Sequence, residues 1–217
     1  VEDLMRQCRL TRGMSIVEIG GSDGVFLRPL AAAGMRVLNI EPVGAVAARA
    51  AACGIETVME FFSPDLATEL ARRWGRAQVI VAKHVLELVP DLHAFMTAID
   101  LLLADDGYVM MEVPYIVDLM NGNFYDILAH LRKYHFSLTG MHELFVRHGL
   151  CIEQVVNYPE LGGGLRVWAR RVGRAHAAPE VSVFLGREET AGIREEGYYR
   201  NCLRRGDRLR DELLAVV

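Results

Sequence analysis

The chain has 217 residues, of which 52% are hydrophobic, and a formal net charge of −4 at pH 7. This composition suits one globular domain of ordinary size with an appendage. The acidic balance argues against a nucleic-acid partner, and no apolar run reaches the roughly 18 to 20 residues that cross a bilayer. The sequence shows no basic, apolar and small-residue leader, so we expect a cytoplasmic protein without a membrane partner.

The four cysteines stand singly and form no Cys-x-x-Cys pair. The sequence therefore predicts neither a metal site nor a disulfide framework. The chain begins at Val1 rather than Met, so we expect an excised or processed piece that belongs to a larger multidomain chain or to an oligomer.

Residues 1–12 predict a short helix, and the segment 16–27 (IVEIGGSDGVFL) after it is the most informative stretch of the chain. Its apolar start is typical of a buried strand, and it passes through a glycine-rich turn into helical apolar spacing. The glycines allow positive φ and let backbone N–H groups approach a ligand, next to the unpaired donors of a helix start. The unit therefore predicts a nucleotide-like ligand at this loop.

Acidic side chains around this loop decide between a dinucleotide and S-adenosylmethionine. A dinucleotide loop keeps clear of carboxylates because a pyrophosphate lies on it, whereas Glu18 and Asp23 lie in this loop or beside it. S-adenosylmethionine carries a sulfonium and an ammonium, for which acids are favourable partners. The second expected strand, 36–40, ends at Glu41, 23 residues after Glu18. We expect Glu41 to bind the two ribose hydroxyls; the alternative is that it only caps the following segment.

Two aromatic residues, Phe61 and Phe62, follow a short third strand expected over 56–59. They either wall an adenine pocket or belong to the core. The fourth strand, 77–82, is a β-branched run typical of the middle of a parallel sheet, and the residues after its carboxyl end face the reactive end of a cofactor. The residues that we expect to contact S-adenosylmethionine are Glu18, Gly20, Gly21, Ser22, Asp23, Gly24, Phe26, Glu41, Pro42, Phe61, Phe62, Lys83, His84 and Leu86.

A segment rich in aromatic, histidine and charged residues, 117–137, follows the fifth expected strand, 107–113. We expect it to lie over the site as a lid that excludes water and supplies acid or base groups. The candidate catalytic residues are His130 and Tyr134 in this lid and His84 after the fourth strand. Each also has a structural reading, as lid packing or as ordinary hydrogen bonding.

Two strand-like runs, 151–157 and 165–171, are separated by so few residues that they must form an antiparallel hairpin. The sequence thus predicts an α/β fold with a mostly parallel seven-stranded sheet and an antiparallel C-terminal hairpin. We expect residues 1–175 to form the cofactor-binding core. The charged helical pattern of residues 176–217 predicts a C-terminal helical appendage or linker.

Together these motifs resemble the C-methyltransferases of antibiotic deoxysugar pathways, which are Rossmann-like class I methyltransferases. The resemblance covers about residues 10–200. It is carried by the runs VEIGGSDG (17–24), IEP (40–42), GIET (54–57), FF (61–62), EVPY (112–115), YHFSL (134–138) and GGGLR (162–166). The resemblance implies S-adenosylmethionine-dependent C-methylation of a small natural-product intermediate.

The sequence also departs from this family. The family's lid motif is similar to Tyr-His-Glu-His, and the matching residues, Ala129–Arg132, keep only the first histidine, His130. The histidines expected after the fourth strand and before the Gly-Gly pair are Leu88 and Leu161. The family's small zinc domain before the core and most of its α/β domain after the core have no counterpart in this sequence.

Two hypotheses follow. The first is an active methyltransferase whose acceptor is a nucleotide sugar or a carrier-bound acyl group. The second is a descendant that no longer methylates, as a cyclase, a decarboxylating enzyme or a structural subunit. The complete cofactor loop favours the first hypothesis and the lost lid groups favour the second. We prefer methyl transfer because it depends mostly on positioning, and we choose His130 as its base because it alone matches a lid histidine.

Overall fold

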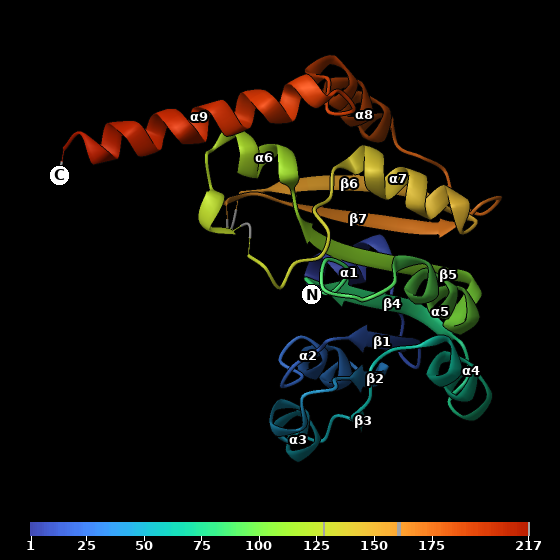
Figure 1. Ribbon diagram of the computed structural model, residues 1–217. Coiled ribbons are helices and arrows are strands. Elements are labelled where there is room, and N and C mark those ends of the chain that lie inside the picture. The colour runs from blue at the N-terminus through green and yellow to red at the C-terminus, as the bar shows by residue number, and fades with distance from the viewer. Residues whose placement is uncertain (128, 160–161, 217) are drawn as a thin grey trace.

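The computed structural model describes residues 1–127, 129–159 and 162–216. In these residues one sheet has the strand order β3-β2-β1-β4-β5-β7-β6. Its strands are β1 (Ser15–Ile19), β2 (Arg36–Ile40), β3 (Thr57–Val58), β4 (Ala77–Lys83), β5 (Leu103–Pro114), β6 (Leu150–Tyr158) and β7 (Gly164–Arg171). Neighbours are parallel except at β7, which runs antiparallel to β5 and β6. The predicted Rossmann-like fold with its antiparallel hairpin is confirmed (Figure 1).

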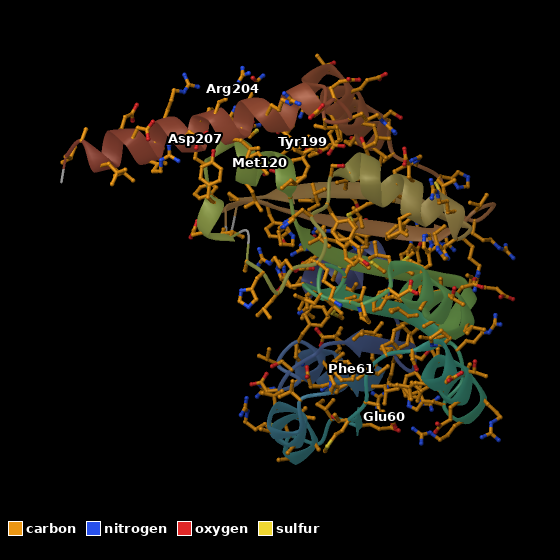
Figure 2. The ribbon with its side chains drawn as sticks, in the orientation of Figure 1. Glu60, Phe61, Met120, Tyr199, Arg204 and Asp207 are labelled. Atoms are coloured by element: carbon orange, nitrogen blue, oxygen red, sulfur yellow. The ribbon has the colours of Figure 1, made fainter. Side chains whose placement is uncertain are left out.

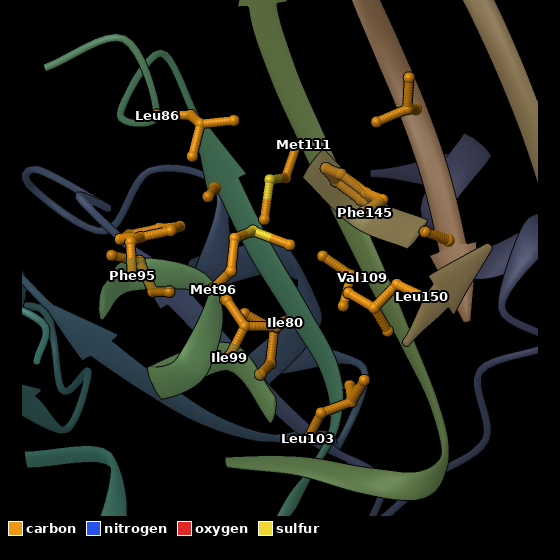
Figure 3. Packing of buried hydrophobic residues seen from close by; sticks show 14 of the residues in the cluster. Ile80, Leu86, Phe95, Met96, Ile99, Leu103, Val109, Met111, Phe145 and Leu150 are labelled. Atoms are coloured by element: carbon orange, nitrogen blue, oxygen red, sulfur yellow. The ribbon is translucent and has the colours of Figure 1, made fainter. Parts of the chain in front are cut away.

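Helices cover both faces of this sheet. They are α1 (Glu2–Gln7), α2 (Leu27–Ala32), α3 (Gly44–Ala52), α4 (Pro64–Arg73), α5 (Leu92–Leu102), α6 (Ile116–Asn121), α7 (Leu138–Arg147), α8 (Pro179–Ala191) and α9 (Glu196–Leu214). On β4, Ile80 packs with residues of α4, α5 and α7, whereas Val79 and Val81 pack with residues of α1 and α2. Figure 3 shows Ile80 beside Met96 and Ile99 of α5. Burial on both faces explains why this strand is an unbroken apolar run.

The register brings the carboxyl ends of four strands to one edge. Ile19, the last residue of β1, pairs with Ile40 of β2 and with Ala82 of β4. Lys83 pairs with Glu112 of β5. The loops that follow β1, β2 and β4 therefore gather along the same edge, where ligands bind in open α/β sheets.

Several strands differ in extent from the sequence prediction, and β4, β6 and β7 do so by a single residue at one or both ends. The third strand is Thr57–Val58 rather than 56–59. The fifth strand begins at Leu103 rather than at residue 107, because Leu103 pairs with Ala77 ahead of a shift in register. None of these differences alters the edge at which the strands end.

The predicted lid segment has local structure of its own. It contains α6 and a short 3-10 helix, Tyr125–Ile127. Near its end, the backbone N–H groups of Lys133 and Tyr134 donate to the carbonyl oxygen of Glu87 at 2.8 and 3.3 Å. The segment is therefore joined to the loop after β4.

A buried carboxylate joins α8 to α7. Glu188 of α8 is 1% exposed and accepts hydrogen bonds from the N–H groups of Leu138 and Thr139, both at 2.7 Å, and from the Thr139 hydroxyl at 2.6 Å. N–H groups at a helix start have no partner within the helix, and an anion there is favourable. Burial, and then the nearby, hydrogen-bonded Glu188, raise the pKa of Tyr115.

The last helix, α9, extends beyond the sheet (Figure 1). Figure 2 shows Met120 of α6 next to it, and Arg205 of α9 donates to the Met120 carbonyl oxygen at 2.7 Å. Tyr125 donates to the Cys202 carbonyl oxygen at 2.8 Å. In the described ranges, none of the helices has both the length and the apolar character needed to span a bilayer.

Candidate active site

A cavity of about 630 Å³ lies at the carboxyl edge of the sheet, between the loops after β1, β2, β3 and β4. The predicted cofactor residues that line it are Gly20, Glu41, Pro42, Phe61, Phe62, Lys83 and His84. The sequence analysis missed the remaining wall, which includes Val43, Val85, Leu88, Val89, Pro90 and Phe95. The apolar run that follows His84 and ends in Pro90 was the feature of the sequence that could have indicated this wall.

Gly20 needs to be glycine. Its φ of +69° is unfavourable for other residues, and a Cβ there would lie 2.5 Å from Cγ2 of Val85. Its N–H donates to the carbonyl oxygen of Ile40 at 2.7 Å, which fixes the loop against the end of β2. The backbone can therefore form part of the cavity wall.

Glu41 lines the cavity and also holds two loops. The residue is 6% exposed, and its carboxylate accepts the N–H groups of Ser22 at 3.0 Å and of Val43 at 2.9 Å, one on each oxygen. A carboxylate oxygen accepts more than one hydrogen bond, so capacity remains for a ligand diol. The structure thus gives Glu41 a role in positioning the loops beside its predicted role in binding ribose.

Glu18 is paired with Lys83 at the end of β4. The Lys83 ammonium lies 3.0 Å from Oε1 of Glu18 and 3.7 Å from the centre of the Phe26 ring. Burial raises the pKa of Glu18, and the charge of Lys83 opposes this rise. A buried acid and a cation therefore meet at the cavity wall.

Asn39 is a polar residue that the sequence analysis missed, although a polar side chain inside the apolar strand β2 was a signal. It is fully buried and donates to the Ser22 carbonyl oxygen at 3.1 Å. Within the described part of the chain, no donor reaches Oδ1 of Asn39 or Oε2 of Glu18. A Cβ on Gly21 would lie 2.4 Å from the first atom and 2.8 Å from the second, so only glycine leaves room there.

Other predicted cofactor residues lie outside the cavity lining. Asp23 accepts the Val25 N–H at 3.3 Å, and the N–H of Gly24 closes the turn on the Gly21 carbonyl oxygen at 2.9 Å. Leu86 is buried in the core at 1% exposure. These residues are therefore not part of the cavity wall.

The two aromatic residues after β3 have different surroundings. Phe61, which is labelled in Figure 2, lines the cavity and is 80% exposed. Phe62 packs edge-on against Phe95 of α5, with ring centres 5.5 Å apart. Phe62 therefore belongs partly to the core, and Phe61 offers an open ring face to a ligand.

His84 lies on the loop after β4 with one neighbour at each ring nitrogen. Its Nδ1 is 3.5 Å from Oε1 of Glu87, and its Nε2 is 3.5 Å from the hydroxyl of Tyr158 at the end of β6. The Glu87 carboxylate is buried, with a side chain 2% exposed. The sequence analysis missed Tyr158, because it lies 74 residues away along the chain.

The two lid candidates have different surroundings. Tyr134 donates to the Pro90 carbonyl oxygen at 3.3 Å, which closes the lid onto the loop after β4. His130 is exposed, and in residues 1–127, 129–159 and 162–216 its side chain makes no hydrogen bond and is not part of the cavity lining. Its catalytic role stays a prediction. The neighbouring His135 has its pKa lowered by burial and by Arg132.

The cavity residues fit S-adenosylmethionine. Ligand pockets of this size are mostly apolar with a few placed polar groups, and here a buried carboxylate and a glycine backbone flank an apolar space. The buried acceptors Oε2 of Glu18 and Oδ1 of Asn39 suit donors rather than a pyrophosphate.

Comparisons with known proteins agree with this geometry. A family described as "Methyltransferase domain" matches residues 2–155. The C-methyltransferase NovU of Streptomyces niveus is 33% identical over 209 residues, which are 96% of this chain and 50% of that protein. The chain thus spans about half the length of this curated relative.

Solved structures show the same fold. Magnesium protoporphyrin IX methyltransferase (ChlM) from Synechocystis PCC 6803, with bound SAH, has a TM-score of 0.61 at 14% identity, over 78% of this chain and 79% of that chain. A SAM-dependent methyltransferase from Anabaena variabilis has a TM-score of 0.62 at 14% identity, over 78% of this chain and 82% of that chain. Because the family match covers more than half of the sequence, this chain belongs to the methyltransferase domain family of S-adenosylmethionine-dependent enzymes.

Proposed function

We propose that this domain transfers the methyl group of S-adenosylmethionine to a carbon atom of a small natural-product intermediate. The observation that carries the proposal is the match, at 33% identity over 96% of this chain, to a C-methyltransferase. The chain spans half of that relative, so the acceptor and the activity of the whole protein are parts of the proposal.

Each wall of the cavity has a role in this proposal. Glu41 accepts the ribose hydroxyls, Phe61 and Phe62 flank the adenine, and Lys83 with its partner Glu18 meets the amino-acid end. The bound cofactor supplies an electrophilic sulfonium methyl group. The chain's own contribution is to orient that group and to exclude water, which accounts for much of the rate in displacements of this kind.

The acceptor that we propose is a carbon acid, in a ketone-bearing nucleotide sugar or a carrier-bound β-ketoacyl group. The alternative is a protein of this family that does not methylate. It is favoured by the lid, where Leu131 is 68% exposed and, with Arg132, replaces the glutamate and histidine of the resembling family.

Two measurements test the proposal. Titration calorimetry with S-adenosylhomocysteine measures cofactor binding. Methyl-labelled S-adenosylmethionine, incubated with a panel of both acceptor classes, measures transfer by mass spectrometry. We expect binding and one labelled acceptor class. Binding without transfer to any acceptor would favour the alternative, and absence of binding would reject the proposed methyl transfer. The cytoplasmic location and the absence of nucleic-acid and membrane partners stay predictions.

A further inference from the structure

The backbone at His84 has an unusual conformation. Its φ of +55° lies in the left-handed region, which non-glycine residues rarely adopt. Its N–H donates to the Glu112 carbonyl oxygen at 2.9 Å, which fixes the residue at the end of β4. Strained residues of this kind persist where the surrounding structure holds them and cluster at functional sites. The imidazole lines the cavity that fits the cofactor.

A buried carboxylate faces this imidazole. Glu87 is 1% exposed, and its Oε1 lies 3.5 Å from Nδ1 of His84. Throughout the described ranges, no hydrogen-bond donor reaches Oε2 of Glu87. A buried carboxylate without donors is costly, so a charged or N–H partner at Oε1 is strongly favoured. The separation is longer than a normal hydrogen bond, as is common in catalytic pairs before ligands bind.

The lid holds Glu87 in place. The Glu87 carbonyl oxygen accepts the N–H groups of Lys133 and Tyr134, so the residue is fixed where the lid meets the loop after β4. One other titratable lid residue, His135, interacts with this carboxylate. Burial and Arg132 lower the pKa of His135, and the charge of Glu87 opposes them. His135 is therefore the imidazole that competes with His84 for Glu87.

The far side of the His84 ring is directed toward Tyr158. When Nδ1 carries the proton and points at a carboxylate, Nε2 has the lone pair and serves as a base. Here Nε2 lies 3.5 Å from the Tyr158 hydroxyl, where β6 reaches the same edge of the sheet. The three groups thus form a line from a buried acid, through an imidazole, to a phenol.

We infer that His84 takes the proton from the acceptor carbon and that Glu87 is the positioning residue that keeps its Nε2 unprotonated. This inference rests on the methyl transfer proposed above. Nε2 of His84 removes the C–H proton, and the C–H electron pair becomes an enolate. The enolate carbon bonds to the methyl carbon, the C–S bond breaks with its electron pair going to sulfur, and the imidazolium then releases its proton to water.

The first test needs no acceptor. Protein labelled with ¹⁵N-histidine and saturated with S-adenosylhomocysteine reports the tautomer of each imidazole at about pH 8, where an ordinary histidine is neutral. We expect His84 to carry its proton on Nδ1, and Glu87→Gln to shift it toward the Nε2–H form. His84→Asn assigns the resonance, because Asn tolerates left-handed φ. The α7 variant His142→Ala serves as the control.

An Nε2–H tautomer of His84 in the native protein would overturn the inference, as would a Glu87→Gln spectrum in which only His135 changes. These outcomes do not depend on whether the protein methylates anything. Circular dichroism checks that each variant is folded.

The second test uses the acceptor found with methyl-labelled S-adenosylmethionine. With S-adenosylhomocysteine and D₂O, methyl transfer cannot occur, and deuterium uptake at the acceptor carbon reports deprotonation alone. We expect His84→Asn to lose about 10²- to 10⁴-fold in this rate, the usual loss for a general base, and Glu87→Gln to lower kcat with little change in KM. If wild-type protein methylates an acceptor and His84→Asn exchanges it at the native rate, the inference fails while the proposed function stands.

Discussion

Glu41 offers a sharp test of the site, because its two roles make different predictions. Glu41 is 6% exposed, and Glu41→Ala removes the carboxylate that accepts two backbone N–H groups. Hydrogen bonds to charged groups contribute about 1.5–3 kcal/mol each, so we expect a loss of about 3 kcal/mol or more in the free energy of unfolding. The free energy of unfolding of a domain is typically about 5–15 kcal/mol, so the variant should still fold.

The same substitution should weaken cofactor binding further. Two hydrogen bonds from the ribose diol to this carboxylate correspond to about 2–3 kcal/mol, or about 30- to 150-fold in the Kd of S-adenosylhomocysteine. Titration calorimetry gives the Kd and urea unfolding gives the stability. The exposed neighbour Glu60 supplies the control, since Glu60→Ala removes the same charge near β3 without touching these contacts (Figure 2). A destabilised Glu41→Ala protein with native affinity would leave Glu41 as a loop anchor alone.

Three further predictions concern single contacts. Gly20→Ala places a Cβ 2.5 Å from Val85 at positive φ, and we expect at least about tenfold weaker binding of S-adenosylhomocysteine by calorimetry; native affinity would place the ligand elsewhere. Burial raises the pKa of Glu18 above 4.5, so ionisation of Glu18 reduces stability as pH rises. Lys83→Met should therefore lower the melting temperature more at about pH 8 than at pH 5. Equal losses at the two pH values would refute the pairing of Lys83 with an ionised Glu18. Burial and the adjacent His93 of α5 lower the pKa of His148. The free energy of unfolding should therefore fall as pH drops below about 6.5, and His148→Gln should make this fall smaller in urea unfolding. If His148→Gln leaves the pH dependence of unfolding unchanged, the lowered pKa of His148 does not contribute to stability.

Strand directions and the edge of the site could be predicted because each follows from a local sequence pattern. Buried parallel strands are apolar throughout, so the β4 run stood out, and Glu41 directly follows the second such run. The short loop between β6 and β7 left only an antiparallel arrangement.

The partners of polar groups could not be predicted in this way, because they come from distant parts of the chain. The hydroxyl of Tyr158 reaches His84 because β6, although it lies at the far end of the sheet, ends at the same edge as β4. Asn39 and Glu18 meet because their strands pair in register. Sequence spacing gives the face and the edge, and the fold supplies the neighbour.

The Glu188 carboxylate has a mechanical consequence for the lid. Tyr115, where the chain enters the lid, hydrogen-bonds to Glu188, and Leu138, where the chain leaves it, donates to the same carboxylate. Both ends of the lid segment are therefore tied to one carboxylate, in addition to the segment's hydrogen bonds to Glu87 and to α9. Glu188→Gln weakens these hydrogen bonds. We expect faster amide hydrogen exchange across 117–137, at both ends of the segment together, with little change in β1 or β4. Helix α8 would then control how freely this segment moves.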